Sequence, residues 1–145
     1  MEKRKFRGRN VSDQWVYGSL VQTKEGEALI VTMEGRELTT VEKVEASTVG
    51  QDTGAYESTD GGAKIYEGDI IRIDGERKPC VVVFYEQAYG LADAEQYAFL
   101  RKGEHPFLND YAHLRGLGDM EIQGLIRVIG NIHDNPELLE EGGAL

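Results

Sequence analysis

The sequence predicts a mainly β fold, and three observations support this prediction. The segment Trp15–Gln22 alternates between two faces, as expected of a strand. In Lys64–Ile73, a Gly-Asp step passes directly into a run of isoleucines, a turn-into-strand pattern that opens many small β-barrels. The chain also has 18 glycines among 145 residues, and several of them lie between short apolar runs, where turns are expected.

The first predicted strand, Trp15–Gln22, has two distinct faces. Trp15 and Tyr17 lie on one face, and Val16 and Leu20 lie on the other. Such a distribution suits a strand of a sheet and does not suit a helix.

Two further strands are predicted after this segment. A turn at Thr23–Gly26 leads to a return strand at Ala28–Met33, so the pair forms a hairpin. Another strand is predicted near Leu38–Val44. From Thr48 to Lys64 the composition changes to Gly, Ser, Thr and Asp, which predicts a domain boundary or a long loop.

The turn at Gly68 and Asp69 is the strongest local signal in the chain. Gly68 can adopt a backbone conformation that is closed to other residues, and Asp69 can hydrogen-bond the local backbone as the chain turns. The apolar run Ile70–Ile73 should then form a strand. It is expected to pair with Cys80–Tyr85 in a hairpin around Asp74-Gly75.

The last third of the chain gives mixed signals. Leu91–Lys102 contains helix-favouring residues, yet its aromatic residues alternate, and we favour a strand. A strand is also predicted near Leu125–Asn131. A short C-terminal helix should follow, with Asn135 as its N-cap, Pro136 at its first position and Gly142-Gly143 at its end.

The charge of the chain restricts its partners. It has 16 basic and 26 acidic residues, a formal net charge of −10 at pH 7. Such a protein repels phosphate backbones, which makes nucleic-acid binding unlikely to be its function. Met1–Arg9 is an exception, with five basic residues against one acidic residue. This segment is either a strand with solvated basic side chains or a phosphate-seeking arm, so nucleic-acid binding is one alternative function.

Cysteine content and hydropathy point to a reducing cytoplasm. Cys80 is the single cysteine, which excludes an internal disulfide framework and suits a reducing compartment. It lies in an apolar run, where a thiol behaves as a small apolar side chain. The sequence shows neither a secretory signal nor an apolar stretch long enough to span a membrane.

Five segments, taken in chain order, resemble the YopX family of phage and prophage proteins. They are Lys5-Phe6-Arg7-Gly8, Trp15-Val16-Tyr17-Gly18-Ser19-Leu20, Thr48-Val49-Gly50-Gln51 with Thr53-Gly54, Lys64-Ile65-Tyr66-Glu67-Gly68-Asp69-Ile70, and Val128-Ile129-Gly130-Asn131-Ile132 followed by Asn135-Pro136-Glu137-Leu138. Gly90–Glu121 departs most from the family pattern. The resemblance implies a β-rich protein of uncharacterised function and brings no assigned activity.

The resemblance also implies a domain organisation. An N-terminal β-hairpin region is expected over residues 1–60, and an SH3-like β-barrel with a terminal helical turn over residues 61–139. Residues 140–145 would be a tail. One intertwined domain is the alternative.

An enzymatic alternative rests on Asp52-Thr53-Gly54, which resembles half of the active site of a dimeric retropepsin-like aspartic protease. In such an enzyme two aspartates share one proton and activate a water molecule. The site needs its aspartate at the end of a buried apolar strand, yet Gly50-Gln51 precede it here. The resemblance instead makes Gly50–Gly54 a turn.

Metal and nucleotide sites are not expected. His105, His113 and His133 are scattered and lack the spacing of zinc ligands. Gly116-Leu117-Gly118 lacks the third glycine of a dinucleotide-binding loop, and the chain has no Walker-type motif. We therefore predict that the protein uses no cofactor.

The favoured function is that of a non-enzymatic protein–protein interaction module. Its partner would be an unknown host or phage protein. A homo-oligomer is also expected, because the edges of short strands need covering. Barrels of this type often bind extended peptides through aromatic residues, which makes Tyr66 the candidate contact residue. A simply packed Tyr66 is the alternative.

Overall fold

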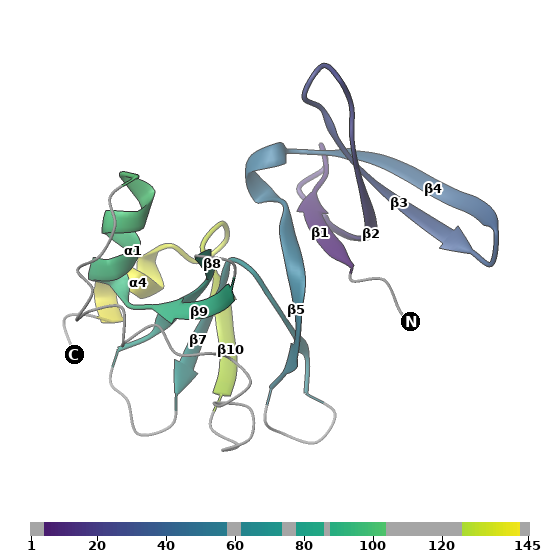
Figure 1. The fold of residues 1–145 in the computed structure, drawn as a ribbon. Helices are drawn as coiled ribbons and strands as arrows, with labels where there is room; N and C mark the ends of the chain where they lie inside the picture. Colours follow the sequence, from purple (N-terminus) through teal and green to yellow (C-terminus); the bar gives the residue numbers. More distant parts are fainter. Residues whose placement is uncertain (1–4, 58–61, 74–77, 86–87, 104–125, 143–145) are drawn as a thin grey trace. The chain divides into compact units, whose positions relative to one another are not determined.

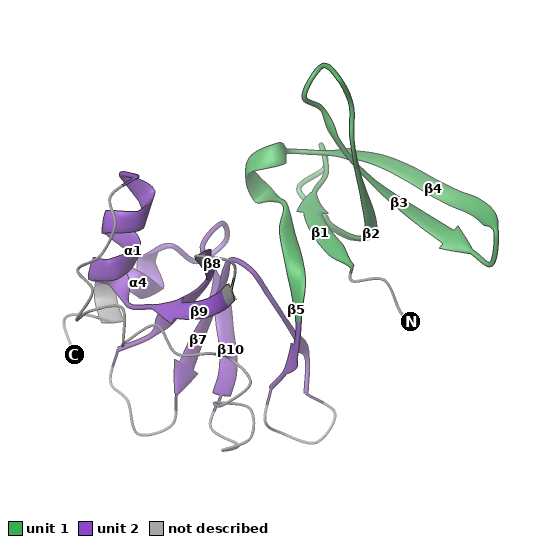
Figure 2. Cartoon of the chain, viewed as in Figure 1, with its two compact units in different colours: residues 1–53 green, residues 54–145 purple. Residues whose placement is uncertain are grey.

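The fold is mainly β, which confirms the predicted fold class. The structure is a computed structural model and describes residues 5–57, 62–73, 78–85, 88–103 and 126–142. Within these residues, ten strands form two antiparallel sheets, accompanied by two α-helices and one 3₁₀-helix (Figure 1). The chain divides into two compact units, Met1–Thr53 and Gly54–Leu145 (Figure 2).

The first unit is built on antiparallel strands in the order β4-β3-β2-β1-β5. Its elements are β1 (Phe6–Arg9), β2 (Trp15–Gln22), β3 (Ala28–Glu34), β4 (Glu37–Val44), the 3₁₀-helix η1 (Ala46–Thr48) and β5 (Gly50–Tyr56), which continues into the second unit. The hairpin of β2 and β3 and the following strand β4 lie where the alternating sequence predicted them.

Strand β2 changes partner near its middle. Residues 15–18 pair with β1, and residues 19–22 pair with β3. Gly18 lies at this change, and a Cβ atom there would be 2.3 Å from the carbonyl oxygen of Val31. Glycine is therefore needed for the two strands to approach this closely.

One face of this sheet covers a small apolar core. Val16 and Leu20 contact this core, so they share one face of β2 as predicted. The core comprises Ala28, Ile30 and Val44, with Phe6, Val16, Leu20 and Val49 packed against it. At the rim of this core, Asn10 forms an isolated antiparallel β-bridge with Val44. Val44, the last residue of β4, therefore has a backbone partner on the side away from β3. The distal half of β4 lies at the edge of the sheet.

Of the boundary or long loop predicted over Thr48–Lys64, the boundary is present, because the two units meet between Thr53 and Gly54, whereas a loop at its start and the turn predicted at Gly50–Gly54 are wrong. Gly50–Tyr56 forms strand β5, and its first residues pair with β1. Glycine and aspartate have low strand propensity, so local sequence argued against this strand. Backbone pairing of Gly50 and Gln51 with β1, on the edge of β1 away from β2, overrides this propensity.

The second unit contains a four-stranded antiparallel sheet with the order β10-β7-β8-β9. Its elements are β6 (Lys64–Tyr66), β7 (Asp69–Ile73), β8 (Cys80–Tyr85), β9 (Ala88–Ala92), the helix α1 (Ala94–Arg101), β10 (Ile126–Asn131) and the helix α4 (Glu137–Gly142). The predicted pairing of Ile70–Ile73 with Cys80–Tyr85 is confirmed by the antiparallel contact of β7 with β8. An SH3-like barrel stays a prediction for this unit.

Both faces of this sheet are buried. On one face Ile71, Ile73 and Val82 pack with Ala55 of β5 and Ile65 of β6. The opposite face, formed by residues such as Ile70, Val81 and Val83, lies under the two helices, which contribute Tyr97, Leu100, Leu138 and Leu139 (Figure 1). Continuous apolar runs are the expected sequence of strands covered on both sides.

The strand favoured over Leu91–Lys102 is wrong for most of its length. Only the first two of these residues belong to β9, and Ala94–Arg101 forms helix α1. Asp93 accepts a hydrogen bond from the Gln96 N–H at 2.8 Å, and the Gln96 side chain accepts one from the Asp93 N–H at 3.0 Å. This capping box starts the helix and outweighs the alternation of its aromatic residues.

The predicted strand near Leu125–Asn131 and the C-terminal helix are both present, as β10 and α4. Ile129 packs on the helix-covered face, next to a register shift in β10 between Val128 and Gly130. Gly130 lies against Asn135, whose Oδ1 accepts a hydrogen bond from the Asn131 N–H at 3.3 Å.

Candidate functional site

The Gly68–Asp69 turn is a structural junction. Gly68 has a φ of 95°, in the region that favours glycine. Its N–H donates to the Val82 carbonyl at 2.9 Å, and its carbonyl accepts from the Ile132 N–H at 3.0 Å. Asp69 is buried, and its carboxylate accepts from the Tyr66 N–H at 2.8 Å. These bonds join β7 to β8 and to the segment that follows β10.

Tyr66 lies beside this junction and is only 6% exposed. Its backbone N–H is held by Asp69, so both its main chain and its ring belong to the interior of the second unit. A buried ring offers little surface to a partner.

Asp52, the candidate protease aspartate, lies within strand β5 of the sheet. It is 6% exposed, and its N–H donates to the Lys5 carbonyl at 2.8 Å. The antiparallel register places Asp52 on the same face as Arg7 of β1. This position differs from the end of an apolar strand that an aspartic protease requires, and the protease alternative stays a prediction.

The described part of the basic N-terminal segment is incorporated into the sheet. The guanidinium carbons of Arg7 and Arg9 lie 4.7 Å and 5.2 Å from the centre of the Trp15 ring. Arg7 is 7% exposed. Cation–π stacking of this kind holds both guanidinium groups against the Trp15 ring and limits their reach toward a phosphate.

Among the described residues there is no cluster of three or more His, Cys, Asp or Glu side chains that could hold a metal. The backbone N–H of His133 donates to Asn131 Oδ1 at 2.9 Å in the turn after β10. His105, His113 and Gly116-Leu117-Gly118 lie outside the described residues. In the part of the chain described, no helix has the length and apolar character needed to cross a membrane.

A contiguous exposed apolar surface lies on the first unit, on the sheet face opposite its core. The β2–β3 register pairs Val21 with Leu29, and the β3–β4 register pairs Val31 with Val41 and Met33 with Leu38. Because paired residues share a face, all six side chains lie on one side. We call this surface the arm face: Val21, Leu29, Val31, Met33, Leu38 and Val41.

The side chains of the arm face are unusually exposed for apolar residues. Leu38 is 57% exposed, Met33 52%, Val41 49% and Val21 44%, and Leu29 and Val31 are partly exposed. These residues form a contiguous patch across three strands. Scattered exposed apolar side chains are common on protein surfaces, whereas contiguous patches mark interaction sites.

The opposite side of the same strands is polar toward the tip of the β3–β4 hairpin. The Thr39 hydroxyl donates to the Thr32 carbonyl at 3.0 Å, and the two hydroxyls lie 2.7 Å apart. The Thr40 hydroxyl also contacts that of Thr32. A register shift at this point lets Leu38 and Val41 share the arm face, although their numbers differ by three.

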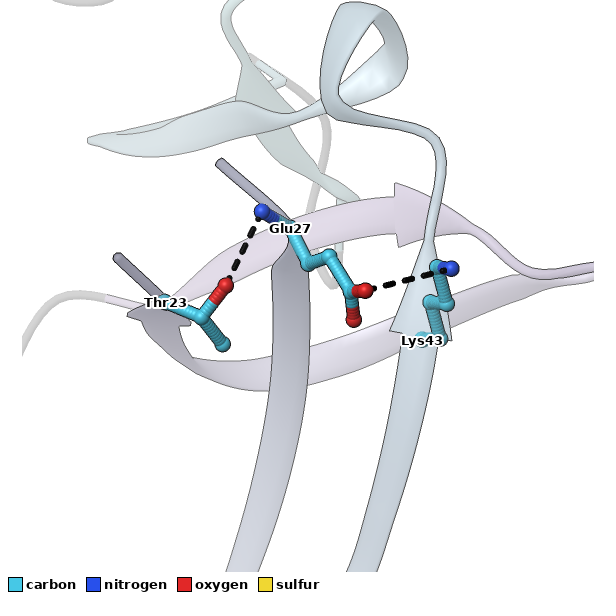
Figure 3. Close-up of polar contacts among 3 residues, drawn as sticks. All are labelled: Thr23, Glu27 and Lys43. Atoms are coloured by element: carbon cyan, nitrogen blue, oxygen red, sulfur yellow. Dashed lines mark hydrogen bonds and ion pairs between the residues drawn. The ribbon is translucent and has the colours of Figure 1, made fainter. Parts of the chain in front are cut away.

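Charged residues lie at both ends of the β3–β4 hairpin. At the base, Lys43 Nζ lies 3.7 Å from Glu27 Oε1, and the Glu27 N–H donates to Thr23 Oγ1 at 3.1 Å (Figure 3). At the tip, Arg36 and Glu37 follow Gly35, whose φ is 64°, and the pairing of Glu37 with Glu34 places it on the side opposite the arm face. All of these charged side chains are exposed.

Sequence reasoning missed the arm face, although one signal was present. Ala28-Leu29-Ile30-Val31 is apolar at four consecutive positions, which is typical of a strand covered on both faces. Strand β7 in the second unit has the same character, and its sheet is covered on both faces.

Comparison with known proteins identifies the family. The family model described as "YopX protein" matches residues 5–140, which is nearly the whole chain. No curated protein and no solved structure matches the chain. The match includes all five segments on which the resemblance was based, and it spans both structural units. The chain belongs to the YopX protein family.

Proposed function

We propose that this protein is a non-enzymatic protein–protein interaction module and that the arm face is its contact surface. The observation that carries the proposal is the contiguous apolar patch across β2, β3 and β4, with four side chains each about half exposed. The family resemblance suggests a phage or prophage protein, so the site of action is the cytoplasm of the bacterial host.

Burial of the arm face supplies the driving force for binding. Apolar surface removed from water contributes roughly 25 cal/mol per Å². The patch lies on a regular sheet, so little conformational entropy is lost when a partner covers it. The net charge of −10 favours a protein over a nucleic acid as this partner.

The positions of the other candidate residues support a non-enzymatic role. Asp52 is an interior residue of a sheet, and Gly68 and Asp69 hold strands together. Arg7 is stacked on Trp15. Each of these residues thus has a structural role, and none of these roles requires a catalytic function.

A photo-crosslinking experiment in bacterial cells tests the proposal. A photoreactive amino acid replaces Leu38 on the arm face in one variant and Thr39 on the opposite side in the other. The two positions are adjacent and both exposed, which makes Thr39 a matched control. We expect the variant at position 38 to form a discrete protein adduct and the variant at position 39 to form none.

Two results would overturn the proposal. The first is the absence of an adduct from position 38, or an equal yield from both positions, which would show that the arm face is not a contact surface. The second is peptide hydrolysis by the wild-type protein that Asp52→Asn abolishes, which would show that the protein is an enzyme.

A further inference from the structure

We infer that the outer edge of β4 pairs with an extended segment of a partner protein, whose side chains alternate between apolar and basic. The inference rests on the proposed function and names the chemistry of its partner. Among the described residues, β4 is the last strand of its sheet, and only the Asn10–Val44 bridge pairs with its edge away from β3 (Figure 1). An edge of this kind is a template for a further strand. We call it the open edge, over Thr40–Lys43.

The backbone groups of Val41 point to the open edge. The Glu45 N–H, in extended backbone, donates to the Arg9 carbonyl at 2.9 Å, on the side away from β3. Alternate residues of a strand direct their N–H and C=O groups to the same edge, so those of Lys43 and Val41 share the direction of Glu45. Val41 therefore presents a donor and an acceptor to an added strand.

The two sides of the open edge differ in chemistry. On one side, Val41 continues the arm face to the edge. Lys43 is the only basic residue of β3 and β4, and its pairing with Leu29 places it on this same side. On the opposite side the β3–β4 register gathers acidic side chains: Glu34, Glu37 and Glu42. The edge is therefore apolar on one side and acidic on the other.

An added strand has to match both sides. Neighbouring side chains of paired strands share a face, whether the strands run parallel or antiparallel. Every second side chain of the added strand thus extends the arm face, where an apolar residue suits Val41. The others lie beside Glu42, where lysine or arginine suits the carboxylate. A second copy of β4 would bring its own carboxylates to this side, and like charges in paired strands repel.

The bulge in β4 limits the length of the paired segment. The register shift skips Thr39, whose hydroxyl donates to the Thr32 carbonyl of β3 at 3.0 Å. This side chain is thus directed toward β3 and away from the open edge. Regular pairing is confined to Thr40–Lys43, which spans roughly 13 Å. Because the segment is short, we expect a dissociation constant on the order of 100 μM.

Synthetic peptides test the inference by fluorescence anisotropy. The probe is a labelled peptide of about seven residues in which valine and lysine alternate. One control has glutamate in place of lysine. The other keeps the sequence and methylates the backbone nitrogens, which removes strand pairing but keeps the positive charge. This second control measures general attraction to a protein of net charge −10. We expect each control to bind at least about fivefold more weakly than the probe.

Val41→Pro tests the backbone contact from the side of the protein. Proline removes the N–H that points to the open edge, and an edge strand tolerates it where that N–H faces away from the sheet. Val41→Ile is the matched control, because it keeps both the N–H and an apolar side chain. We expect Val41→Pro to weaken binding of the probe about tenfold and Val41→Ile to change it less than about twofold. Far-ultraviolet circular dichroism checks that both variants are folded.

Glu42→Gln tests the acidic side of the edge. Asn10 Nδ2 donates to Glu42 Oε1 at 3.1 Å, and the amide oxygen of glutamine can accept the same bond. Glu25→Gln is the matched control, since it removes the same charge from the exposed turn between β2 and β3. We expect Glu42→Gln to weaken binding of the probe about threefold and Glu25→Gln to leave it nearly unchanged.

The outcomes separate this inference from the proposed function. Equal binding of the probe and either control peptide would overturn the inference, and this comparison needs only the wild-type chain. Unchanged binding of the probe by a folded Val41→Pro would overturn it too. A photo-crosslinked adduct from position 38 that is undiminished by Val41→Pro, or that contains a second copy of this chain, would also overturn it. Such an adduct would leave the interaction function of the arm face standing.

Discussion

Gly130 should be essential for docking helix α4 on the sheet of the second unit. A Cβ atom at Gly130 would lie 2.6 Å from Asn135 Oδ1 and 2.9 Å from Leu138 Cδ1. Neither approach is compatible with normal packing, so Gly130→Ala must displace both side chains. This displacement would weaken the hydrogen bond from the Asn131 N–H to Asn135 and shift Leu138 from the core.

The magnitude follows from these contacts. Overpacking of this kind costs about 1–3 kcal/mol of unfolding free energy. Removal of the Asn135 hydrogen bond by Asn135→Ala alone should cost about 0.5–1.5 kcal/mol. The double variant removes the nearer clash, so its cost should be smaller than the sum of the single costs by at least about 0.5 kcal/mol.

Urea denaturation followed by far-ultraviolet circular dichroism measures the effect. With an m-value of about 1–3 kcal/mol/M, a loss of about 2 kcal/mol lowers the midpoint by roughly 1 M. Amide hydrogen exchange at Ile70 and Ile71 localises the loss to the second unit, while Trp15 fluorescence reports on the first. An unchanged midpoint for Gly130→Ala, or strictly additive costs in the double variant, would refute the reasoning.

Three further substitutions test other parts of the structure. Gly68→Val should lower the unfolding free energy by about 1–3 kcal/mol, because a β-branched residue is strained at a φ of 95°; an unchanged denaturation midpoint would contradict this. Gly18→Ala should cost at least about 2 kcal/mol, since its Cβ would lie 2.3 Å from a backbone oxygen of β3; a Trp15 fluorescence transition equal to that of the wild type would show that the strands can separate without cost. Burial raises the pKa of the Tyr97 phenol above its usual 10.0, opposed by Arg101, so the neutral form is favoured in the folded state. The stability that the neutral Tyr97 phenol contributes is fully present below pH 10 and is lost as pH rises through the folded pKa. The wild type should therefore lose more unfolding free energy above pH 10 than Tyr97→Phe. Parallel pH profiles of the two proteins would be inconsistent with a buried phenol.

The sequence by itself determined those features that depend on neighbouring residues. The two faces of β2 follow from alternation, which fixes the side of Val16 and Leu20 whatever the strand packs against. The hairpin of β7 and β8 follows from two apolar runs around a turn signal. The family segments, spread over nearly the whole chain, could likewise be identified from the sequence.

Tertiary structure alone decided the features that local sequence preference does not predict. The residues of β5 have the composition of a turn, yet they form a strand. Their backbone groups hydrogen-bond the edge of β1 that β2 does not pair with. The sequence left open whether Tyr66 is packed or exposed, and the structure buries it beside the Gly68–Asp69 turn. The arm face depends on the registers of three strands and on the shift near Thr39, which together bring Leu38 and Val41 to one side. Register is a relation between distant segments, and the alternation within any one strand does not contain it.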